Sequence, residues 1–364
     1  MDREKVREFQ SSLKAGAVNE EIRQQVLRNW DSLALPLDGM GAFREITAQI
    51  GGILEDPDVE IGKKAVMVFC SDNGIVEEGV SQTGQDVTRI VAESMGMKKS
   101  SVCLMAQKIG AEVIPVDVGI SAGQHLPGVL DRKIRAGSRN FRKEPAMTQD
   151  EALQALRTGM DLAGECRQKG CRLLGTGEMG IGNTTTSSAV AASLLGEDVR
   201  AVTGRGAGLS DAGYEKKCRV IEEALEKYDL RKQDVFTILE TVGGYDIAAL
   251  AGLCIGGCIC GIPVVLDGVI SMTAALAAVR ILPKTREFLI ASHASREPAA
   301  QRLGAELGLS PVIEGRMALG EGTGAVMMMS LLDLSVSVYH GMRTFEGSGI
   351  RPYQRYGHEN RAEQ

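Results

Sequence analysis

Short apolar runs alternate with helix-like segments through residues 60–295 of this 364-residue chain. The runs read as strands at 65–70, 111–118, 171–174, 263–267 and 287–292. The clearest helix between them begins after Thr148, which forms a capping box with Glu151, and ends near Gly170. Strands that alternate with helices form a parallel sheet that is covered by helices on both faces. The sequence therefore predicts an α/β fold.

Both ends of the chain lack strands of this kind. Residues 1–60 contain three helix-like segments, and a long apolar helix is expected after residue 325. A chain of 364 residues is long enough for about two domains. We predict a small helical domain built from residues 1–60 and 325–364, and a large α/β domain over 61–324.

One uncharged segment, residues 247–266, is long enough to be confused with a membrane span. Glycines crowd its second half, Pro263 interrupts it, and the residues that follow read as a strand. We predict a buried helix followed by a buried strand. The net charge of −6 and the pI near 5.5 argue against a nucleic-acid or membrane-surface partner. The charged first residues lack the apolar core of a secretory signal, so we expect a cytoplasmic protein.

The eight cysteines form no C-x-x-C pair, and the four histidines lie far apart in the sequence. Without a secretory signal, reduced thiols are the default. Structural and catalytic zinc sites need clustered ligands. We therefore predict no metal site.

Small and polar residues follow every predicted strand. They occupy residues 71–74, 117–119, 175–178, 266–268 and 291–293. Because ligands of open α/β sheets bind at the carboxyl ends of the strands, these segments predict one polar site at that edge.

The segment 175–180 fits the G-x-G-x-x-G pattern of a dinucleotide-binding turn. Glu178 argues against that interpretation, because it would place a carboxylate where a pyrophosphate should lie. The helix also begins late, after Gly182, at Asn183 and Thr184. A helix N-terminus of this kind suits a phosphate. A nicotinamide-dinucleotide oxidoreductase nevertheless stays open as the alternative.

Three more charged residues are candidates for a site. Arg205 lies in a second glycine loop, and Lys217 is placed so that it could point inward from the next helix. Glu321 follows apolar residues and is flanked by glycines. Loss of hydration raises the pKa of such a carboxyl group and makes it a better base.

Several motifs together resemble the nicotinate-nucleotide–dimethylbenzimidazole phosphoribosyltransferase family, whose members make the lower-ligand nucleotide of cobalamin. They are GEMGIGNTT (177–185), PGVLDRKIRAGSRNF (127–141), GRGAGLSDAG (204–213), LDGVI (266–270), ASHASREP (291–298) and MALGEGTGA (317–325). Their order and spacing resemble the family from about residue 35 to 350.

The resemblance implies a Rossmann-like, mostly parallel sheet with helices on both faces, a small all-helical domain and a homodimer. It also implies a reaction in which the 5-phosphoribosyl group of nicotinate mononucleotide passes to a nitrogen of 5,6-dimethylbenzimidazole. The products are α-ribazole 5′-phosphate and nicotinate. No cofactor or metal takes part.

The resemblance also assigns roles to individual residues. Glu321 corresponds to the catalytic base and Glu178 to a second carboxylate near the ribose. The nucleotide and its phosphate would be bound by Gly177, Gly180, Gly182, Asn183, Thr184, Arg205, Lys217 and Ser295. The acceptor base would be bound by Ser81, Gln85, Met179 and Leu319.

The sequence departs from the family pattern at three places. Asn73 stands where many members have histidine, Asp246 replaces a usual glutamate, and residues 36–41 differ from the common motif. Because flat apolar pockets discriminate poorly between similar rings, the acceptor could be another benzimidazole, a purine or a phenol. A catalytically silent binding homologue is a further alternative.

Overall fold

The computed structural model describes residues 3–123 and 125–354 of the chain. The chain divides into two compact units, one of Met1–Ala17 with Gly62–Met329 and one of Val18–Ile61 with Ser330–Gln364. The predicted small domain also includes residues 1–2 and 355–364, which lie outside the described residues. That the two units are separate domains stays a prediction.

The larger unit contains a six-stranded sheet in the order β3-β2-β1-β4-β5-β6. The strands are β1 (Lys64–Ser71), β2 (Glu112–Gly119), β3 (Leu130–Asp131), β4 (Leu173–Met179), β5 (Val264–Leu266) and β6 (Leu289–Ala291). Every neighbouring pair is parallel, and the order is that of a Rossmann-type sheet. The predicted fold class is confirmed. Only β3 was not predicted, because a two-residue strand leaves no apolar run.

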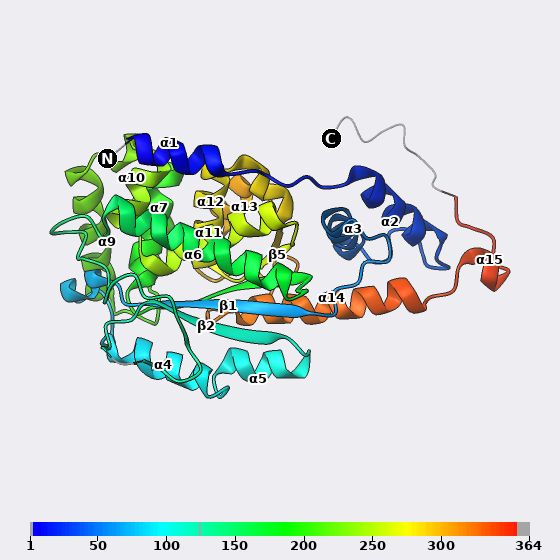
Figure 1. Cartoon of the computed structure of the whole chain (residues 1–364), viewed down its shortest axis with the longest axis horizontal. Helices are drawn as coiled ribbons and strands as arrows, with labels where there is room; N and C mark the ends of the chain where they lie inside the picture. The colour runs from blue at the N-terminus through cyan, green and yellow to red at the C-terminus, as the bar shows by residue number, and fades with distance from the viewer. Residues whose placement is uncertain (1–2, 124, 355–364) are drawn as a thin grey trace. The chain divides into compact units, whose positions relative to one another are not determined.

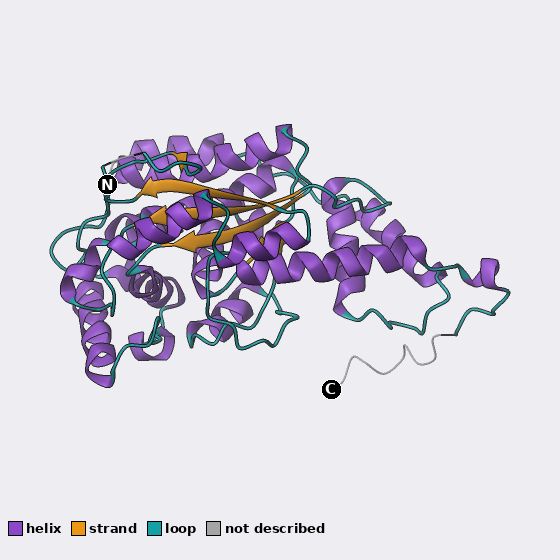
Figure 2. Cartoon of the chain, turned by 90° about the horizontal axis from the view of Figure 1, so that it is seen from below, coloured by secondary structure: helices purple, strands orange, loops and turns teal. Residues whose placement is uncertain are grey.

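Helices cover both faces of the sheet (Figures 1 and 2). Helices α4 (Asp86–Gly96) and α5 (Ser101–Lys108) lie on one side of β1 and β2. On the other side lie α6 (Gln149–Gln168), α7 (Asn183–Leu195), α11 (Tyr245–Cys260) and α12 (Val269–Ile281). The remaining helices of this unit are α1 (Arg3–Ser12), α8 (Val199–Val202), α9 (Asp211–Lys227), α10 (Val235–Val242), α13 (Ala299–Leu307) and the first part of α14 (Thr323–Gly341). Three short 3-10 helices are η1 (Gly74–Glu78), η2 (Leu230–Lys232) and η3 (Pro283–Phe288).

The apolar segment 247–266 forms most of α11 and then β5, as predicted. Its glycines allow α11 to pack closely against α6. A Cβ atom at Gly252 would lie 2.0 Å from the carbonyl oxygen of Leu156, and one at Gly159 would lie 2.0 Å from that of Ala249. Among the residues that the model describes, no helix is long and apolar enough to cross a bilayer.

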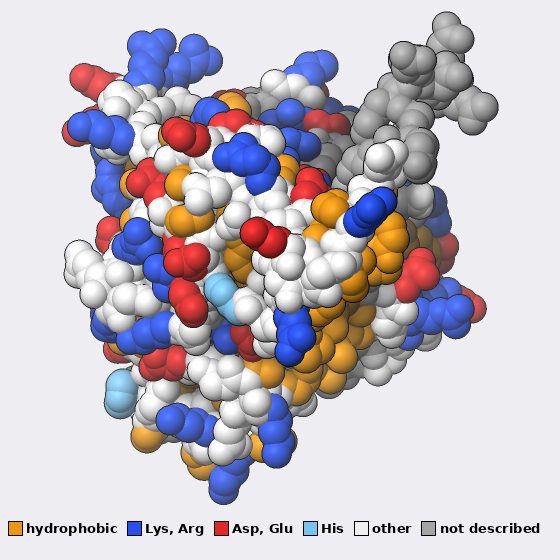
Figure 3. Space-filling view, turned by 90° about the vertical axis from the view of Figure 1, so that its right-hand side faces the viewer, with side chains coloured by type: hydrophobic (Ala, Val, Ile, Leu, Met, Phe, Trp, Pro, Cys, Tyr) orange, Lys and Arg blue, Asp and Glu red, His pale blue; other side chains and the backbone are white. Residues whose placement is uncertain are grey.

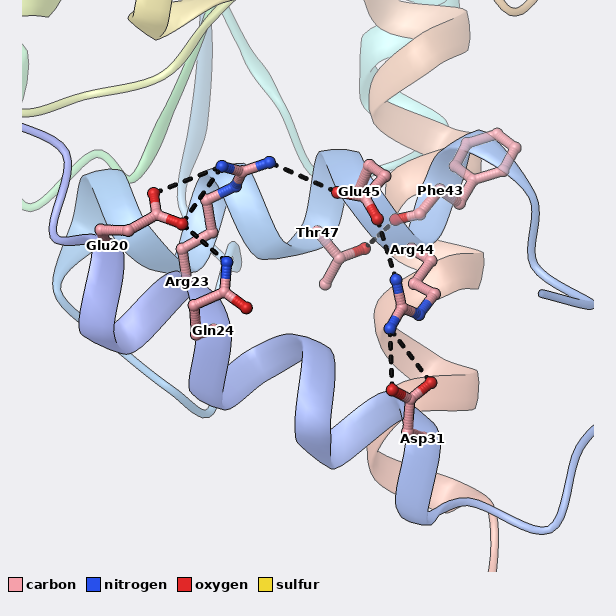
Figure 4. A network of polar contacts seen from close by, with 8 residues as sticks. All are labelled: Glu20, Arg23, Gln24, Asp31, Phe43, Arg44, Glu45 and Thr47. Carbon is pink, nitrogen blue, oxygen red and sulfur yellow. Dashed lines mark hydrogen bonds and ion pairs between the residues drawn. The ribbon is translucent and has the colours of Figure 1, made fainter. Parts of the chain in front are cut away.

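The second unit is described by α2 (Glu20–Ser32), α3 (Ala42–Leu54), the later part of α14 and α15 (Phe345–Ser348). Ion pairs connect α2 to α3 (Figure 4). Arg23 of α2 lies 3.4 Å from Glu45 of α3, and Arg44 of α3 lies 3.0 Å from Asp31 of α2. The same arginines also pair within their own helices, Arg23 with Glu20 at 3.3 Å and Arg44 with Glu45 at 2.8 Å.

Helix α1 differs from the prediction, which placed residues 1–60 in one helical domain. Its Phe9 ring packs edge-on against Phe236 at 6.0 Å, and its Lys5 pairs with Asp150 at 2.7 Å. Residues 3–17 therefore group with the larger unit. The amphipathic pattern of α1 predicted the helix, but it carried no information about which partner the apolar face would cover.

Candidate active site

A cavity of about 330 Å³ lies at the carboxyl end of the sheet, within the larger unit. Three of its walls are the segments that follow β4, β5 and β6. Two loops, around residues 81–82 and 205–209, and the turn 318–321 complete it. The predicted site at the strand ends is thus formed by three of the five polar segments. Asp117, near the end of β2, instead pairs with Lys133 at 3.2 Å and lines a separate, smaller cavity.

Most of the predicted site residues lie in this cavity. Its walls include Ser81, Glu178, Met179, Gly180, Gly182, Asn183, Thr184, Arg205, Ser295, Leu319 and Glu321. Three predicted residues do not line it: Gly177, Gln85 and Lys217. Gln85 instead donates a hydrogen bond to the carbonyl of Asn73 at 3.1 Å.

Glu178 reaches the cavity from the end of β4 and is 9% exposed. Burial raises its pKa to about 8, and the negative charges of Asp267, Asp246 and Glu321 act in the same direction. The side-chain amide of Asn183 donates to its carboxyl group and opposes this shift. A side chain at Gly320 would displace this carboxyl group, because a Cβ atom there would lie 2.6 Å from Glu178 Oε1.

Glu321 is held differently. It has a φ of 60°, between Gly320 at 78° and Gly322 at 91°. Such left-handed backbone is uncommon for a residue with a side chain and is concentrated at functional sites. Its Oε2 accepts the N–H of Val102 at 3.4 Å, in the first turn of α5. Burial raises the pKa of Glu321, as the apolar surroundings in the sequence predict.

The loop after β4 leads into α7 through Gly182, whose φ is 95°. A side chain there would meet Val76 Cγ2 at 2.7 Å, so the position requires glycine. The N-terminus of α7 has no side-chain cap, which leaves it suited to an anion. Behind it, Lys217 donates to Thr184 Oγ1 at 3.0 Å and is 0% exposed. Burial lowers the pKa of Lys217 to about 8, although the negative charge of Glu297 acts to raise it.

The G-x-G-x-x-G match at 175–180 does not form a strand-to-helix turn. Gly175 and Gly177 lie inside β4, and α7 starts only at Asn183. A Cβ atom at Gly177 would lie 2.7 Å from the carbonyl oxygen of Glu321, and one at Gly175 would meet Met329 at 2.9 Å. These glycines therefore allow the segment that begins α14 to approach the strand. The dinucleotide alternative loses its structural basis.

Asn183 and Arg205, two of the predicted nucleotide-binding residues, also have side-chain partners within the protein. The side-chain amide of Asn183 donates to Glu178 and Asp246 rather than extending from the helix N-terminus. Arg205 pairs with Asp211, and it donates to the carbonyl of Leu209 at 2.9 Å.

Three titratable residues of the cavity were not named as site residues from the sequence: Asp267, His293 and Glu297. Asp267 accepts the N–H groups of Gly322 at 3.1 Å and Gly324 at 2.7 Å, so it fixes the turn that carries Glu321. The polar segments after β5 and β6 were the available signal for Asp267 and His293. Two of the three departures from the family pattern are in contact, since the side-chain amide of Asn73 donates to Asp246 at 3.4 Å.

Comparisons with known proteins show the family to which the chain belongs. A family model described as phosphoribosyltransferase (DBI_PRT) matches residues 15–350. A nicotinate-nucleotide–dimethylbenzimidazole phosphoribosyltransferase of Acetivibrio thermocellus is 41% identical over 346 residues, which cover 95% of this chain and 99% of that protein. A protein of the same name from Ruminiclostridium cellulolyticum is 40% identical over 337 residues, which cover 93% of this chain and 96% of that protein.

A solved structure has the same fold. The crystal structure of CobT from Thermus thermophilus has a TM-score of 0.87 and 35% sequence identity, and the match covers 92% of this chain and 100% of that one. Family model, sequence relatives and structure all extend over nearly the whole chain. The chain therefore belongs to the DBI_PRT phosphoribosyltransferase family.

Proposed function

We propose that this protein transfers the 5-phosphoribosyl group of nicotinate mononucleotide to a nitrogen of 5,6-dimethylbenzimidazole or a related aromatic base. The products are α-ribazole 5′-phosphate and nicotinate. The observation that carries the proposal is the convergence of three features on one cavity: Glu321, Glu178 and the N-terminus of α7. Sequence relatives that carry the name of this activity support the same substrates.

In this proposal the phosphate binds at the loop 180–184. The open helix N-terminus favours an anion, and Gly182 permits close approach of the backbone. Lys217 donates a hydrogen bond to the Thr184 hydroxyl, which would in turn donate to the phosphate, so the positive charge of Lys217 would lie one side chain away from the anion. An arriving phosphate would favour the charged form of Lys217, whose pKa burial lowers to about 8. Arg205 and Ser295 lie in the same cavity and would bind the remainder of the nucleotide.

The two glutamates would act at the reacting carbon. The bond between C1′ and the pyridinium nitrogen breaks, and its electron pair neutralises the ring, so nicotinate leaves without an acid. A benzimidazole nitrogen forms the new bond to C1′, while Glu321 accepts the proton of its other nitrogen. Glu178 would stabilise the developing positive charge on the sugar. The pyridinium of the substrate would draw Glu178 toward its ionised form, although burial raises its pKa to about 8.

The acceptor base would lie against Leu319 and Met179, beside the loop that carries Ser81. Leu319 is 56% exposed, so its side chain offers apolar surface to a flat ligand. Gln85 points away from the cavity toward Asn73, so its predicted part in this pocket would be indirect.

We expect the protein to be cytoplasmic and to act as a homodimer. Ile90, Met97 and Leu104 on and beside α4 and α5 are exposed by 46%, 57% and 57%, and burial against a second copy would remove this apolar surface from water. On the face drawn in Figure 3, acidic and basic side chains are interspersed. That mixture does not favour a nucleic acid on that face. Light scattering coupled to size-exclusion chromatography measures the oligomeric state.

The proposal is tested by incubating the protein with nicotinate mononucleotide and dimethylbenzimidazole. We expect release of nicotinate and formation of α-ribazole 5′-phosphate, with no product in the absence of the base. No nicotinate release with any of the benzimidazoles, adenine or phenols would favour a catalytically silent homologue. Thermal unfolding adds a second test, because stronger stabilisation by a dinucleotide than by the mononucleotide would contradict the assignment.

A further inference from the structure

A buried polar network lies beneath the loop that leads into α7. At its centre is Asp246, which is 0% exposed and stands in the first turn of α11. In the described part of the chain, its carboxylate accepts hydrogen bonds from amide groups and not from a cation. The donors are the side chains of Asn183 at 3.2 Å and Asn73 at 3.4 Å, and the backbone of Ile247 at 3.0 Å.

The amide of Asn183 is shared between two carboxyl groups. Its Nδ2 donates to Asp246 and also to Glu178. The orientation of the neighbouring Asn73 is set by Thr186, whose hydroxyl donates to Asn73 Oδ1 at 2.9 Å. Asp246 also abuts the loop backbone, since a Cβ atom at Gly180 would lie 2.7 Å from its Oδ2.

We propose that Asp246 is a positioning residue that acts on Glu178 through the shared side-chain amide of Asn183. By holding Asn183, it fixes the direction from which Glu178 receives its hydrogen bond. Its negative charge also favours the protonated form of Glu178. The inference rests on the role proposed above for Glu178 in the transfer reaction.

Other groups act on Glu178 as well. The charges of Asp267 and Glu321 raise its pKa in the same direction as that of Asp246, and the thiol of Cys70 lies close enough to interact with Glu178 and Asp246. Burial raises the pKa of Asp246 itself to about 6, which leaves it largely ionised at neutral pH. Of these charged groups, Asp246 is the one joined to Glu178 through a single side chain.

A structural role alone makes a different prediction. Asp246 stabilises the start of α11 through the N–H of Ile247, so its loss would lower stability in either case. A role confined to α11 leaves the titration of Glu178 unchanged, whereas the proposed action on Glu178, by charge and through the amide of Asn183, requires that it change. The decisive measurement is therefore the ionisation of Glu178 and not the stability of the protein.

The titration is measured by NMR on full-length protein with 13C-labelled glutamate carboxyl groups, where the Glu178 signal is the one that Glu178→Gln removes. In Asp246→Asn, we expect its midpoint to fall by about one pH unit or more. The matched control is Asp234→Asn, which removes a carboxylate from the start of α10 and should leave the midpoint unchanged. An unchanged midpoint in folded Asp246→Asn overturns the proposal.

A second variant covers the case in which Asp246→Asn does not fold. Asn183→Ala removes the donor between the two carboxyl groups, so the Glu178 midpoint should rise. A midpoint that stays or falls overturns the proposal. In the transfer assay, the limb of the kcat/KM–pH profile that Glu178→Gln abolishes should move to lower pH in Asp246→Asn. A wild-type protein that releases no nicotinate overturns the proposed function, while the NMR titration still decides the positioning role.

Discussion

The end of β4 and the turn before α14 each bring one glutamate to the same cavity, and they hold it by different means. Glu178 stands on a buried strand and receives a hydrogen bond from a side-chain amide. Glu321 stands on a strained turn and accepts a backbone N–H from the start of α5. The pKa of Glu178 is raised to about 8 by burial, and its carboxyl group is mostly protonated before a cation arrives. In the proposed reaction, environment rather than residue type would assign these two carboxyl groups to two roles.

The largest effect should come from Glu321→Gln. Turnover should fall by roughly 10²–10⁴-fold, because an amide cannot accept the proton of the attacking base. Binding of nicotinate mononucleotide should be retained, since the substitution leaves the phosphate site proposed at the start of α7 untouched. Nicotinate release and calorimetric titration measure the two quantities. Near-normal turnover would remove Glu321 from its assignment as base.

Glu178→Gln should lower turnover less, by roughly tenfold to 10²-fold, because the amide preserves the shape of the protonated group but not its charge. The pH response centred near 8 should also disappear. The rate profile between about pH 6 and pH 9 measures this. A profile identical to that of the wild-type protein would show that Glu178 does not titrate in the working enzyme.

The same substitution should stabilise the protein at alkaline pH. The pKa of Glu178 in the folded protein, about 8, exceeds its ordinary value of 4.5. The stability that it contributes is therefore complete below about pH 4.5 and is lost as the pH rises through about 8. Glu178→Gln should raise the free energy of unfolding by about 1–3 kcal/mol at about pH 9, and by less at about pH 5. Urea unfolding at both values tests this, with Glu226→Gln on the exposed face of α9 as the control.

The smallest effect is expected from Gly320→Ala. Alanine in left-handed backbone lowers the free energy of unfolding by about 1 kcal/mol. Its Cβ atom would also lie 2.6 Å from Glu178 Oε1, which is too close, so the carboxyl group would have to move. Gly110→Ala is the matched control, because its φ of 63° imposes the same backbone strain with no atom within 4 Å. Both variants should lose similar stability, but only Gly320→Ala should lose turnover, by a few-fold. Equal turnover in the two variants would show that a side chain at position 320 does not disturb the function of Glu178.

Much of the fold could be predicted from local pattern. The strands that became β1, β2, β4, β5 and β6 were apolar runs, because strands of a covered parallel sheet are buried on both faces. The capping box at Thr148 and Glu151 was predicted and is present. The unit against which α1 packs was not predictable, since a periodic apolar face does not specify its partner.

The site was predictable as a set of chain segments and less so as a set of contacts. The positions of Glu178 and Glu321 in one cavity follow from motifs at strand ends and turns. The hydrogen bonds of the Asn183 amide could not be predicted from such motifs, because its two partners are separated from it by 5 and 63 residues in the sequence.

The sequence by itself therefore determined the layers of the fold, the loop before α7 and the pair of glutamates. These depend on local periodicity and on residues whose chemistry is written in the chain. Only the tertiary structure decided that Gly175 and Gly177 serve packing rather than a dinucleotide, and that Asn73 meets Asp246. Contacts between distant segments depend on how the sheet and helices stack, and burial then sets which carboxyl groups keep their protons.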